Sequence, residues 1–369
     1  MEKGFKIQIF PNEEQKKLMF KSFGCARFAY NWALAKEKES HKNNGKFISD
    51  GELRKEFTQL KKKEEFKWLN EVNNNVTKQA IKDLCKAYRN FFNKKSEHPR
   101  FKKKKLKKSF YNDVYRIKFE NYKVRIASIG WMNMAENRIP RDCKYVNPRV
   151  SFDGVKFWLS ISCILEDEEN NLPKTEPIGI DMGIKALMTC SNGMNFNRVS
   201  TKKEKKKLKR LQRRASRHYD KMMKTKSSDK SKNLLKLETL IHKQYQRISN
   251  VRLNNIHQAT TKLVRLNPKA IVVEDLNVQG MMKNKYLSEK IADCSFHEIY
   301  RQLEYKCQNK GIEFIVADRF YPSSKICSNC GHKKEKLSLS ERTYRCECCG
   351  KVIDRDFNAS LNLKNLAYN

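Results

Sequence analysis

Hydrophobic and polar positions follow two different periods along this chain, and one change of period falls near residue 110. Between residues 12 and 95, apolar side chains recur every three or four positions, which is the spacing of amphipathic helices. Asn12 precedes the first of these stretches as an N-cap, and Gly24 inside it is a candidate break. The pattern predicts a helical subdomain with helices over residues 13–42, 50–63 and 75–92.

Strict alternation, the period of a half-buried strand, occurs on both sides of this helical region. Residues 5–10 alternate apolar and polar positions and stop at Pro11. Between residues 109 and 165, short alternating runs are separated by clusters of Asn, Gly, Pro and Asp. They predict a small antiparallel β unit, which the first strand could join. Its predicted strands cover residues 115–119, 123–126, 149–152 and 155–164.

A linker at residues 173–177 leads into a region where strand and helix patterns alternate. Strands are predicted over residues 178–181 and 184–190, followed by a hairpin turn at Ser191-Asn192-Gly193. A basic helix over residues 202–217 and a long amphipathic helix ending near residue 266 come next. The remaining predicted elements are strands at 270–274 and 312–318, a helix at 295–310 between them, and a last helix at 357–366. This order predicts an α/β domain.

Composition adds a strong charge to this picture. The 369 residues include 79 Lys and Arg against 41 Asp and Glu, a formal net charge of +38. Such an excess opposes compaction unless a polyanion neutralises it, so nucleic acid is the expected partner and an anionic membrane the weaker alternative. The longest apolar run, Trp158–Leu165, is too short to span a bilayer, and the N-terminus lacks the pattern of a signal peptide.

Much of the positive charge lies in two runs, residues 94–108 and 202–217. A single lysine run is usually a solvated surface. Two separate runs interleaved with apolar residues are better explained as grooves for phosphate backbones. The candidate phosphate contacts are Arg100, Lys102, Lys103, Lys104, Lys206, Arg210, Arg213 and Arg214.

Five of the twelve cysteines crowd into residues 327–349, while the other seven are scattered singly. Four of the five form two Cys-x-x-Cys-Gly units, Cys327/Cys330 and Cys346/Cys349, separated by fifteen residues. This spacing predicts a structural zinc ribbon with four thiolate ligands in a reducing, cytoplasmic setting. Cys348 and His332 are alternative ligands. With four protein ligands, the zinc would hold structure and perform no chemistry.

Three acids stand at strand ends or at a helix start: Asp181, Glu274 and Asp356. Open α/β sheets carry their active sites beyond the carboxyl ends of the strands, so acids from separate strands can converge. A cluster of this kind needs divalent cations, and two Mg²⁺ ions could hydrolyse a phosphodiester. Taken singly, each acid has a plainer explanation: Asp181 as a turn former, Asp356 as an N-cap.

The chain resembles the TnpB family, insertion-sequence-encoded RNA-guided DNA endonucleases that are related to the type V CRISPR effectors. The resemblance covers nearly the whole chain in order. It rests on Phe10-Pro11 with Glu14-Gln15, Phe23-Gly24-Cys25-Ala26-Arg27 with Tyr30-Asn31, His98-Pro99-Arg100-Phe101-Lys102, Gly179-Ile180-Asp181-Met182-Gly183, Val273-Glu274-Asp275-Leu276, Pro322-Ser323-Ser324-Lys325 and Asp354-Arg355-Asp356-Phe357-Asn358-Ala359. Cys348 departs from the family's usual pattern.

The resemblance implies a wedge β-barrel interrupted by a helical recognition domain, followed by an RNase H-like RuvC nuclease domain with an inserted zinc ribbon. The implied boundaries are 1–11 for the first wedge strand, 12–108 for the recognition domain with its basic loop, 109–172 for the wedge barrel, 173–319 for the first RuvC part with a basic helical insertion at 200–266, 320–351 for the zinc ribbon and 352–369 for the second RuvC part. The family's RuvC acids fall on Asp181, Glu274 and Asp356. Asp356 is preferred over Asp354 because the family's motif is Asp-x-Asn-Ala.

By the same resemblance, the protein binds a guide RNA from the transposon end and cleaves double-stranded target DNA beside a short motif. The helix region that resembles the motif reader contains Thr77, Lys78, Gln79 and Lys82. A monomer in a prokaryotic cytoplasm, associated with the nucleoid, is expected, and a dimer stays open.

Two other functions are compatible with this sequence. One is an RNA-guided DNA-binding repressor without nuclease activity, which would have lost RuvC acids that are all present here. The other is a transposase that acts directly on element ends. That chemistry would need a nucleophile such as tyrosine, and none of the fourteen tyrosines stands in a His-hydrophobe-His setting.

Overall fold

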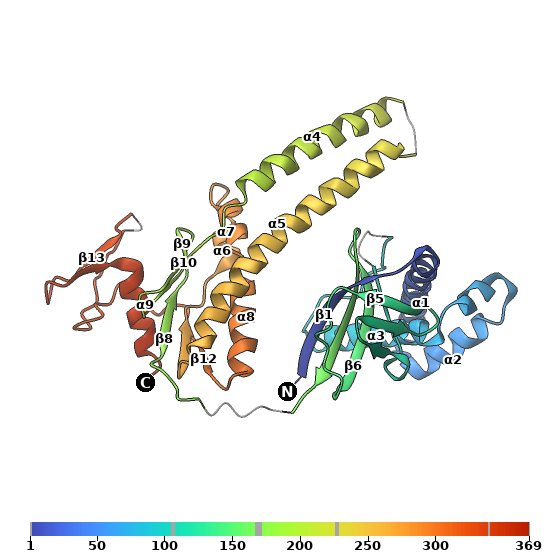
Figure 1. Ribbon diagram of the computed structural model, residues 1–369, viewed down its shortest axis with the longest axis horizontal. Coiled ribbons are helices and arrows are strands. Elements are labelled where there is room, and N and C mark those ends of the chain that lie inside the picture. The colour runs from blue at the N-terminus through green and yellow to red at the C-terminus, as the bar shows by residue number, and fades with distance from the viewer. Residues whose placement is uncertain (1, 105–107, 167–171, 226–228, 339, 369) are drawn as a thin grey trace. The chain divides into compact units, whose positions relative to one another are not determined.

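The computed structural model describes residues 2–104, 108–166, 172–225, 229–338 and 340–368. The chain forms two compact units, Met1–Asp167 and Glu168–Asn369, each with its own hydrophobic core. Each unit is described by itself (Figure 1). Among the described residues, no helix combines the length and the apolar character that crossing a bilayer requires.

Strand β1 (Glu2–Phe10) lies near the centre of an antiparallel seven-stranded sheet in the first unit, in the order β2-β6-β7-β1-β5-β4-β3. The other strands are β2 (Lys108–Tyr111), β3 (Lys118–Glu120), β4 (Lys123–Ile126), β5 (Gly130–Met134), β6 (Lys144–Phe152) and β7 (Phe157–Ile164). The prediction that the first strand joins the later β unit is confirmed, since β1 pairs with both β5 and β7. The predicted strand at 115–119 is partly wrong, because Val114–Arg116 forms a 3-10 turn capped by Asp113.

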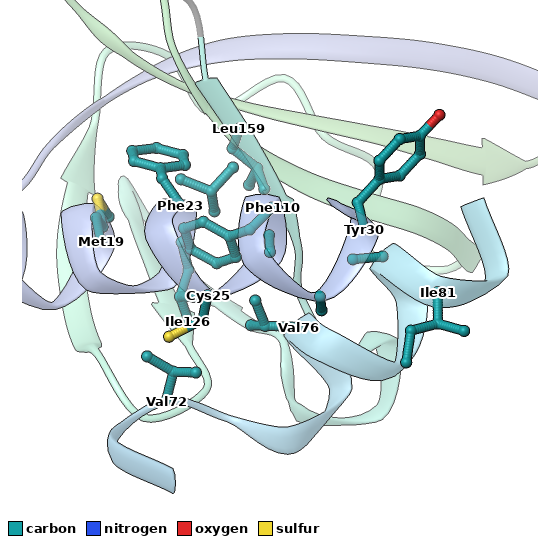
Figure 2. Close-up of a cluster of buried hydrophobic side chains, with 14 of the residues drawn as sticks. Met19, Phe23, Cys25, Tyr30, Val72, Val76, Ile81, Phe110, Ile126 and Leu159 are labelled. Atoms are coloured by element: carbon teal, nitrogen blue, oxygen red, sulfur yellow. The ribbon is translucent and has the colours of Figure 1, made fainter. Parts of the chain in front are cut away.

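Four helical segments separate β1 from the rest of its sheet: α1 (Glu13–Asn44), α2 (Asp50–Leu60), the 3-10 helix η1 (Glu64–Glu71) and α3 (Asn74–Phe92). Asn12 caps α1 in a reciprocal capping box with Gln15. The break considered at Gly24 does not occur, and α1 continues through it. The buried faces of α1 and α3 pack with the sheet through residues that include Phe23, Val76 and Leu159 (Figure 2).

The second unit is built on a five-stranded sheet in the order β10-β9-β8-β11-β12. Its strands are β8 (Ile178–Asp181), β9 (Ala186–Cys190), β10 (Asn195–Asn197), β11 (Ala270–Val273) and β12 (Glu313–Val316). Strands β8, β11 and β12 run parallel, and β9 pairs antiparallel with β8. This arrangement is the RNase H-like sheet that the sequence led us to expect.

Helices cover both faces of this sheet. The helices of this unit are α4 (Lys202–Lys224), α5 (Lys232–Arg265), α6 (Val278–Met282), α7 (Ser288–Cys294), α8 (Phe296–Gln308) and α9 (Arg355–Asn365). Of these, α4 packs on α5 and not on the sheet. Ile180 and Val273 pack with residues of α5 and α8, whereas Val272 on the opposite face packs with Leu363 of α9. Helices α4 and α5 form the long hairpin seen in Figure 1, and α4 extends seven residues beyond its predicted end.

Between β12 and α9 lies a small hairpin of β13 (Thr343–Arg345) and β14 (Val352–Asp354). Tyr344 is fully buried at its centre, and its hydroxyl donates to the carbonyl oxygens of Lys325 and His332. This hairpin carries the second pair of clustered cysteines, and it leads directly into α9.

Candidate active site and zinc centre

Asp181 and Glu274 lie side by side at one edge of the five-stranded sheet. The parallel register of β8 and β11 aligns Ile180 with Val273, so the next residue on each strand is one of the two acids. Both strands point their carboxyl ends toward this edge, the usual place for an active site in such sheets. The sequence places each acid at a strand end, and the register makes them neighbours.

Gly179 explains how the third acid reaches the same edge. A Cβ at this position would lie 2.0 Å from the carbonyl oxygen of Ser360 and 2.3 Å from the amide nitrogen of Lys364. Only a residue without a side chain lets the backbone of α9 approach β8 this closely. Asp356 lies one helical turn before Ser360, so the contact brings the start of α9 toward Asp181.

Burial and the neighbouring carboxylates shift the pKa values of Asp181 and Glu274. Burial raises the pKa of Asp181 well above its ordinary value, and the charges of Glu274 and Asp356 raise it further. Burial also raises the pKa of Glu274, and Asp356 adds to the effect. The arrangement therefore concentrates negative charge that the chain itself compensates only in part, through Arg355, which lowers both pKa values.

Neighbouring groups hold Glu274 in place. Its carboxylate accepts the backbone N–H of Met182 at 3.2 Å. Tyr300 of α8 donates its hydroxyl to the Glu274 carbonyl oxygen and accepts the N–H of Leu276 at 3.1 Å. Both the side chain and the backbone of this acid are thereby fixed relative to the sheet edge.

The structure distinguishes between the two aspartates at the start of α9. Asp354 is the N-cap, and its side chain accepts the N–H of Phe357 at 3.0 Å. Asp356 lies in the first helical turn and interacts with Asp181 and Glu274, and its Oδ1 lies 3.9 Å from Nη1 of Arg342, the residue before β13. The plainer explanation of Asp356 as an N-cap is therefore wrong, because that role belongs to Asp354.

The four predicted zinc ligands form one compact group. The sulfur atoms of Cys327, Cys330, Cys346 and Cys349 all lie within 4.8 Å of one another. Two of the Sγ–Sγ distances are 3.5 and 3.6 Å, close to the ~3.8 Å that follows from four Zn–S bonds of about 2.3 Å in a tetrahedron. Among the described residues, this is the one set of three or more His, Cys, Asp or Glu side chains gathered so tightly.

Both knuckles turn in the same way. Gly331 and Gly350 have φ of 75° and 71°, the left-handed conformation that glycine adopts without strain. Each glycine donates its N–H to the carbonyl oxygen of the first cysteine in its knuckle, Cys327 or Cys346. The backbone N–H of Lys351, and with it the side-chain amide of Asn329, lower the pKa of Cys349 to about 6, which favours the thiolate that binds metal.

The alternative ligands remain outside this group. Cys348 and His332 are exposed, and neither joins the four sulfur atoms. The donor set, its spacing and its geometry fit zinc with four cysteine ligands.

Two buried asparagines of α9 connect the zinc ribbon to the sheet edge. Asn358 donates to the Ile326 carbonyl at 2.7 Å and accepts the Ser328 N–H at 3.0 Å. Asn362 donates to the carbonyl oxygens of Ser323 and Ile326. The segment that enters the first knuckle is therefore bonded to the same helix that carries Asp356.

The four residues predicted to read DNA on α3 do not share one surface. Lys78 and Lys82 are exposed. Thr77 is fully buried and donates to the Asn74 carbonyl, so its side chain cannot contact nucleic acid in this structure. Gln79 is half-buried and donates to Asp83 at 3.0 Å.

The predicted phosphate contacts on the basic runs lie on the surface. Arg100, Lys102, Lys103, Lys104, Lys206, Arg210, Arg213 and Arg214 are all exposed. On α4, the apolar side chains of Leu208, Leu211 and Ala215 are buried, and the cations occupy the other positions. The run at 94–108 includes residues 105–107, which lie outside the described part of the chain.

Sequence reasoning missed the residues that position the acids: Gly179, Tyr300, Asn358 and Asn362. Gly179 and Asn358 lie inside motifs that were quoted for the resemblance, and this was the only signal available for them. Nothing local marks Tyr300 or Asn362, because their roles depend on contacts across 26 and 36–39 residues.

Three family models match this chain. Residues 160–285 match the OrfB_IS605 model, described as "Probable transposase", and residues 296–363 match a Cas12f1-like TNB domain. Residues 1–46 match a model described as a helix-turn-helix domain, although in this structure they form β1 and the single helix α1.

Similar proteins cover almost the whole length. A Streptomyces pristinaespiralis protein named "Putative RNA-guided DNA endonuclease" is 33% identical over 379 residues, covering 98% of this chain and 89% of that protein. An Escherichia coli K12 protein with the same description is 31% identical over 376 residues, covering 97% of this chain and 90% of the relative. A solved Cas12f1-sgRNA-target DNA complex contains a chain of similar fold, with a TM-score of 0.59, 13% identity and 99% coverage of both chains.

Proposed function

Since this chain belongs to the TnpB family, we propose that it is an RNA-guided DNA endonuclease that hydrolyses phosphodiesters with Mg²⁺ held by Asp181, Glu274 and Asp356. The observation that carries the proposal is the convergence of these three acids at one edge of the RNase H-like sheet. DNA binding without catalysis does not require three carboxylates at one sheet edge, where the charges of Glu274 and Asp356 raise the pKa of Asp181.

The chemistry of the site supports a divalent metal. Two Mg²⁺ ions, when bound, activate a water and stabilise the leaving oxygen of the phosphodiester. The residues of the chain hold the ligand oxygens in position: the Met182 N–H and Tyr300 orient Glu274, and the contact at Gly179 holds the helix of Asp356. Metal binding must displace protons from acids of raised pKa, so cleavage should weaken as the pH falls.

Two nucleic acids are the proposed partners: a guide RNA from the transposon end and the target DNA. The exposed cations of α4 and of residues 100–104 are proposed to contact their backbones, and Lys78 and Lys82 to lie near the target-adjacent motif. The four cysteines are proposed to hold a structural Zn²⁺. We assign the wedge, recognition, RuvC and zinc-ribbon domains to the boundaries given above, with the protein acting as a monomer in the bacterial cytoplasm at the nucleoid.

The test begins with the RNA that copurifies with the full chain expressed beside its native flanking DNA. That RNA is sequenced and used to direct cleavage of a matching plasmid in Mg²⁺. Asp181→Asn, Glu274→Gln and Asp356→Asn should each lower the cleavage rate by at least about 10³-fold while RNA copurifies as before.

Asp354→Asn is the matched control. Asn caps a helix as well as Asp does, so this variant should fold and cleave like the wild type. Undiminished cutting by any of the three acid variants would overturn the assignment of the site. Discrete RNA without cleavage in any divalent metal would favour the repressor, and cutting of element ends that persists after RNase treatment would favour the transposase.

A further inference from the structure

An open groove of about 490 Å³ lies on α1 in the first unit, the unit that does not contain the three acids. It is lined by Gly24, Arg27, Phe28, Asn31, Trp32 and Trp68. None of the candidate nucleic-acid contacts named above lines it. We call it the Trp68 groove.

The floor of the Trp68 groove contains a glycine that the fold does not require. Gly24 lies inside the 32-residue helix α1, where glycine costs roughly 0.5–1 kcal/mol relative to alanine. Its φ is not in the left-handed region, and a Cβ built on it would meet nothing within 4 Å. Neither backbone conformation nor internal packing explains this residue, whereas close approach of a ligand to the helix would.

The walls of the groove are aromatic. Trp68 on η1 remains 40% exposed, and its ring meets Phe28 edge to face at 5.3 Å. The ring of Trp32 packs edge to face with that of Phe57, with 5.1 Å between the ring centroids. Aromatic rings that are held in this way and left partly exposed, as Trp68 is, are suited to stacking against a flat group such as a nucleobase.

Positive charge lies at the border of the groove. Arg27 is half-buried, and no carboxylate partner is found for it in the described part of the chain. Asn31 exchanges two hydrogen bonds with the backbone of Lys102, at 2.8 and 3.0 Å, so the basic run that includes Lys103 and Lys104 starts beside the groove. The nearby Glu71 of η1 is already paired with Lys21.

We propose that the Trp68 groove binds an unstacked nucleobase of the guide RNA, with its ring on Trp68, Arg27 against the base or its phosphate, and the adjoining backbone along residues 102–104. RNA is favoured over target DNA because RNA loops and ends present unpaired bases to aromatic and arginine side chains, whereas duplex DNA keeps its bases stacked. The groove thus deepens the proposed function by naming a base-binding site for the RNA partner, and it rests on that function.

The experiment measures binding of a fluorescent single-stranded RNA, and of DNA of the same sequence, to the full chain and its variants. Trp68→Ala should weaken RNA binding by about 5- to 100-fold, the equivalent of one lost stacked base, while Trp68→Phe keeps most of the affinity. The salt dependence of binding should stay unchanged in both, because no charge is removed. Trp131→Ala is the matched control, since Trp131 is also 40% exposed but lies outside the groove.

Gly24→Ala and Gly24→Leu provide a second test that does not depend on losing a contact. Both residues favour helix, and the space at Gly24 is open, so these variants should raise the melting temperature of the first unit. Both variants should nevertheless weaken RNA binding. Gly24→Leu should weaken it more than Gly24→Ala, because the leucine side chain fills the groove. A structural glycine would show the opposite pattern, with lower stability and unchanged affinity.

The outcomes separate this proposal from the one it rests on. Wild-type chain that binds no RNA would overturn both. Wild-type RNA binding that is matched by Trp68→Ala and by Gly24→Leu would overturn the groove alone and leave guided cleavage standing. If Trp68→Ala and Gly24→Leu weakened binding of the DNA probe only, the groove proposal would also be overturned. The occupant would then be a displaced DNA strand.

Discussion

At the scale of single residues, Glu37 of α1 shows what burial does to a carboxylate that has no cation beside it. Its side chain is 3% exposed, Oε2 accepts the Ile48 N–H at 3.2 Å, and Oε1 has no hydrogen-bond partner. Burial raises its pKa to about 7. Below that pH the folded protein holds a proton there, and above it an uncompensated charge stays buried.

The sign of the pH effect follows from this shift. Between the ordinary pKa of 4.5 and the folded value of about 7, the folded state binds more protons than the unfolded state. The unfolding free energy of the first unit should therefore fall as the pH rises through this window, by on the order of 1–3 kcal/mol. Glu37→Gln should remove the slope and be the more stable protein at pH 8, a pH chosen roughly one unit above the shifted pKa.

Urea unfolding followed by tryptophan fluorescence measures this effect, because all four tryptophans lie within residues 32–158. Glu39→Gln is the control: Glu39 is exposed on the same helix and 3.6 Å from Lys36. A Glu37→Gln variant that kept the wild-type pH slope would contradict the assignment.

At the scale of elements, the proposed active site depends on how α9 packs against β8. Two of its acids lie at the ends of neighbouring strands of one sheet, whereas Asp356 lies on a helix. Its position is set by direct backbone contact at Gly179 and by the bonds of Asn358 and Asn362 to the zinc-ribbon segment. The ribbon and the sheet therefore both act on Asp356 through one helix.

Gly179→Ala should displace that helix while leaving every acid in the chain. The added methyl group would overlap the α9 backbone, with an overpacking cost of about 1–3 kcal/mol or more, and cleavage should fall by at least tenfold. Hydrogen exchange over residues 355–365 and the cleavage rate together measure the effect. Gly4→Ala, where a Cβ meets nothing within 4 Å, should match the wild type. Normal cleavage by Gly179→Ala would show that the contact yields without moving Asp356.

At the scale of the whole molecule, the net charge is +38, and the cations behind it differ in whether a carboxylate pairs with them. Some cations are neutralised in pairs, such as Lys16 with Glu13 and Arg301 with Glu298. In the described part of the chain, no carboxylate pairs with the exposed cations of α4, whereas the half-buried Lys205 pairs with Glu289 and Asp293 of α7. Unpaired cations are the ones expected to exchange counterions for phosphates.

Two variants with the same net charge test whether the unpaired cations of α4 matter more for RNA binding than paired cations elsewhere. One variant replaces Lys206, Arg210, Arg213 and Arg214 with Gln, and the other replaces the paired Lys16, Lys67, Arg138 and Arg301 with Gln. Each lowers the net charge from +38 to 38 − 4 = +34. The first set should reduce the slope of log K against log salt for RNA by about 3, at roughly 0.7 per lost contact. The second set should change it little. Equal slopes in the two variants would mean that α4 has no particular place in binding.

Local patterns determined much of this protein by themselves. Alternation placed β1, β4 and β8, and spacing alone selected the four cysteines that the structure brings within 4.8 Å of one another. Asp181 and Glu274 could be named because strand ends are visible as the end of an apolar run, whereas the choice of Asp356 over Asp354 came from the resemblance to the TnpB family. Each of these features depends on residues close together in the chain, where period and spacing are informative.

Only the tertiary structure decided the rest, because burial and contact between distant segments have no local signature. It showed that Asp354 is the N-cap of α9 and that Asp356 belongs to the cluster of acids. It also showed that Thr77, predicted on a binding surface, is buried, and that α1 continues unbroken through Gly24. The register of β8 with β11 made two acids neighbours, and the missing side chain of Gly179 let a helix from the far end of the sequence complete the site.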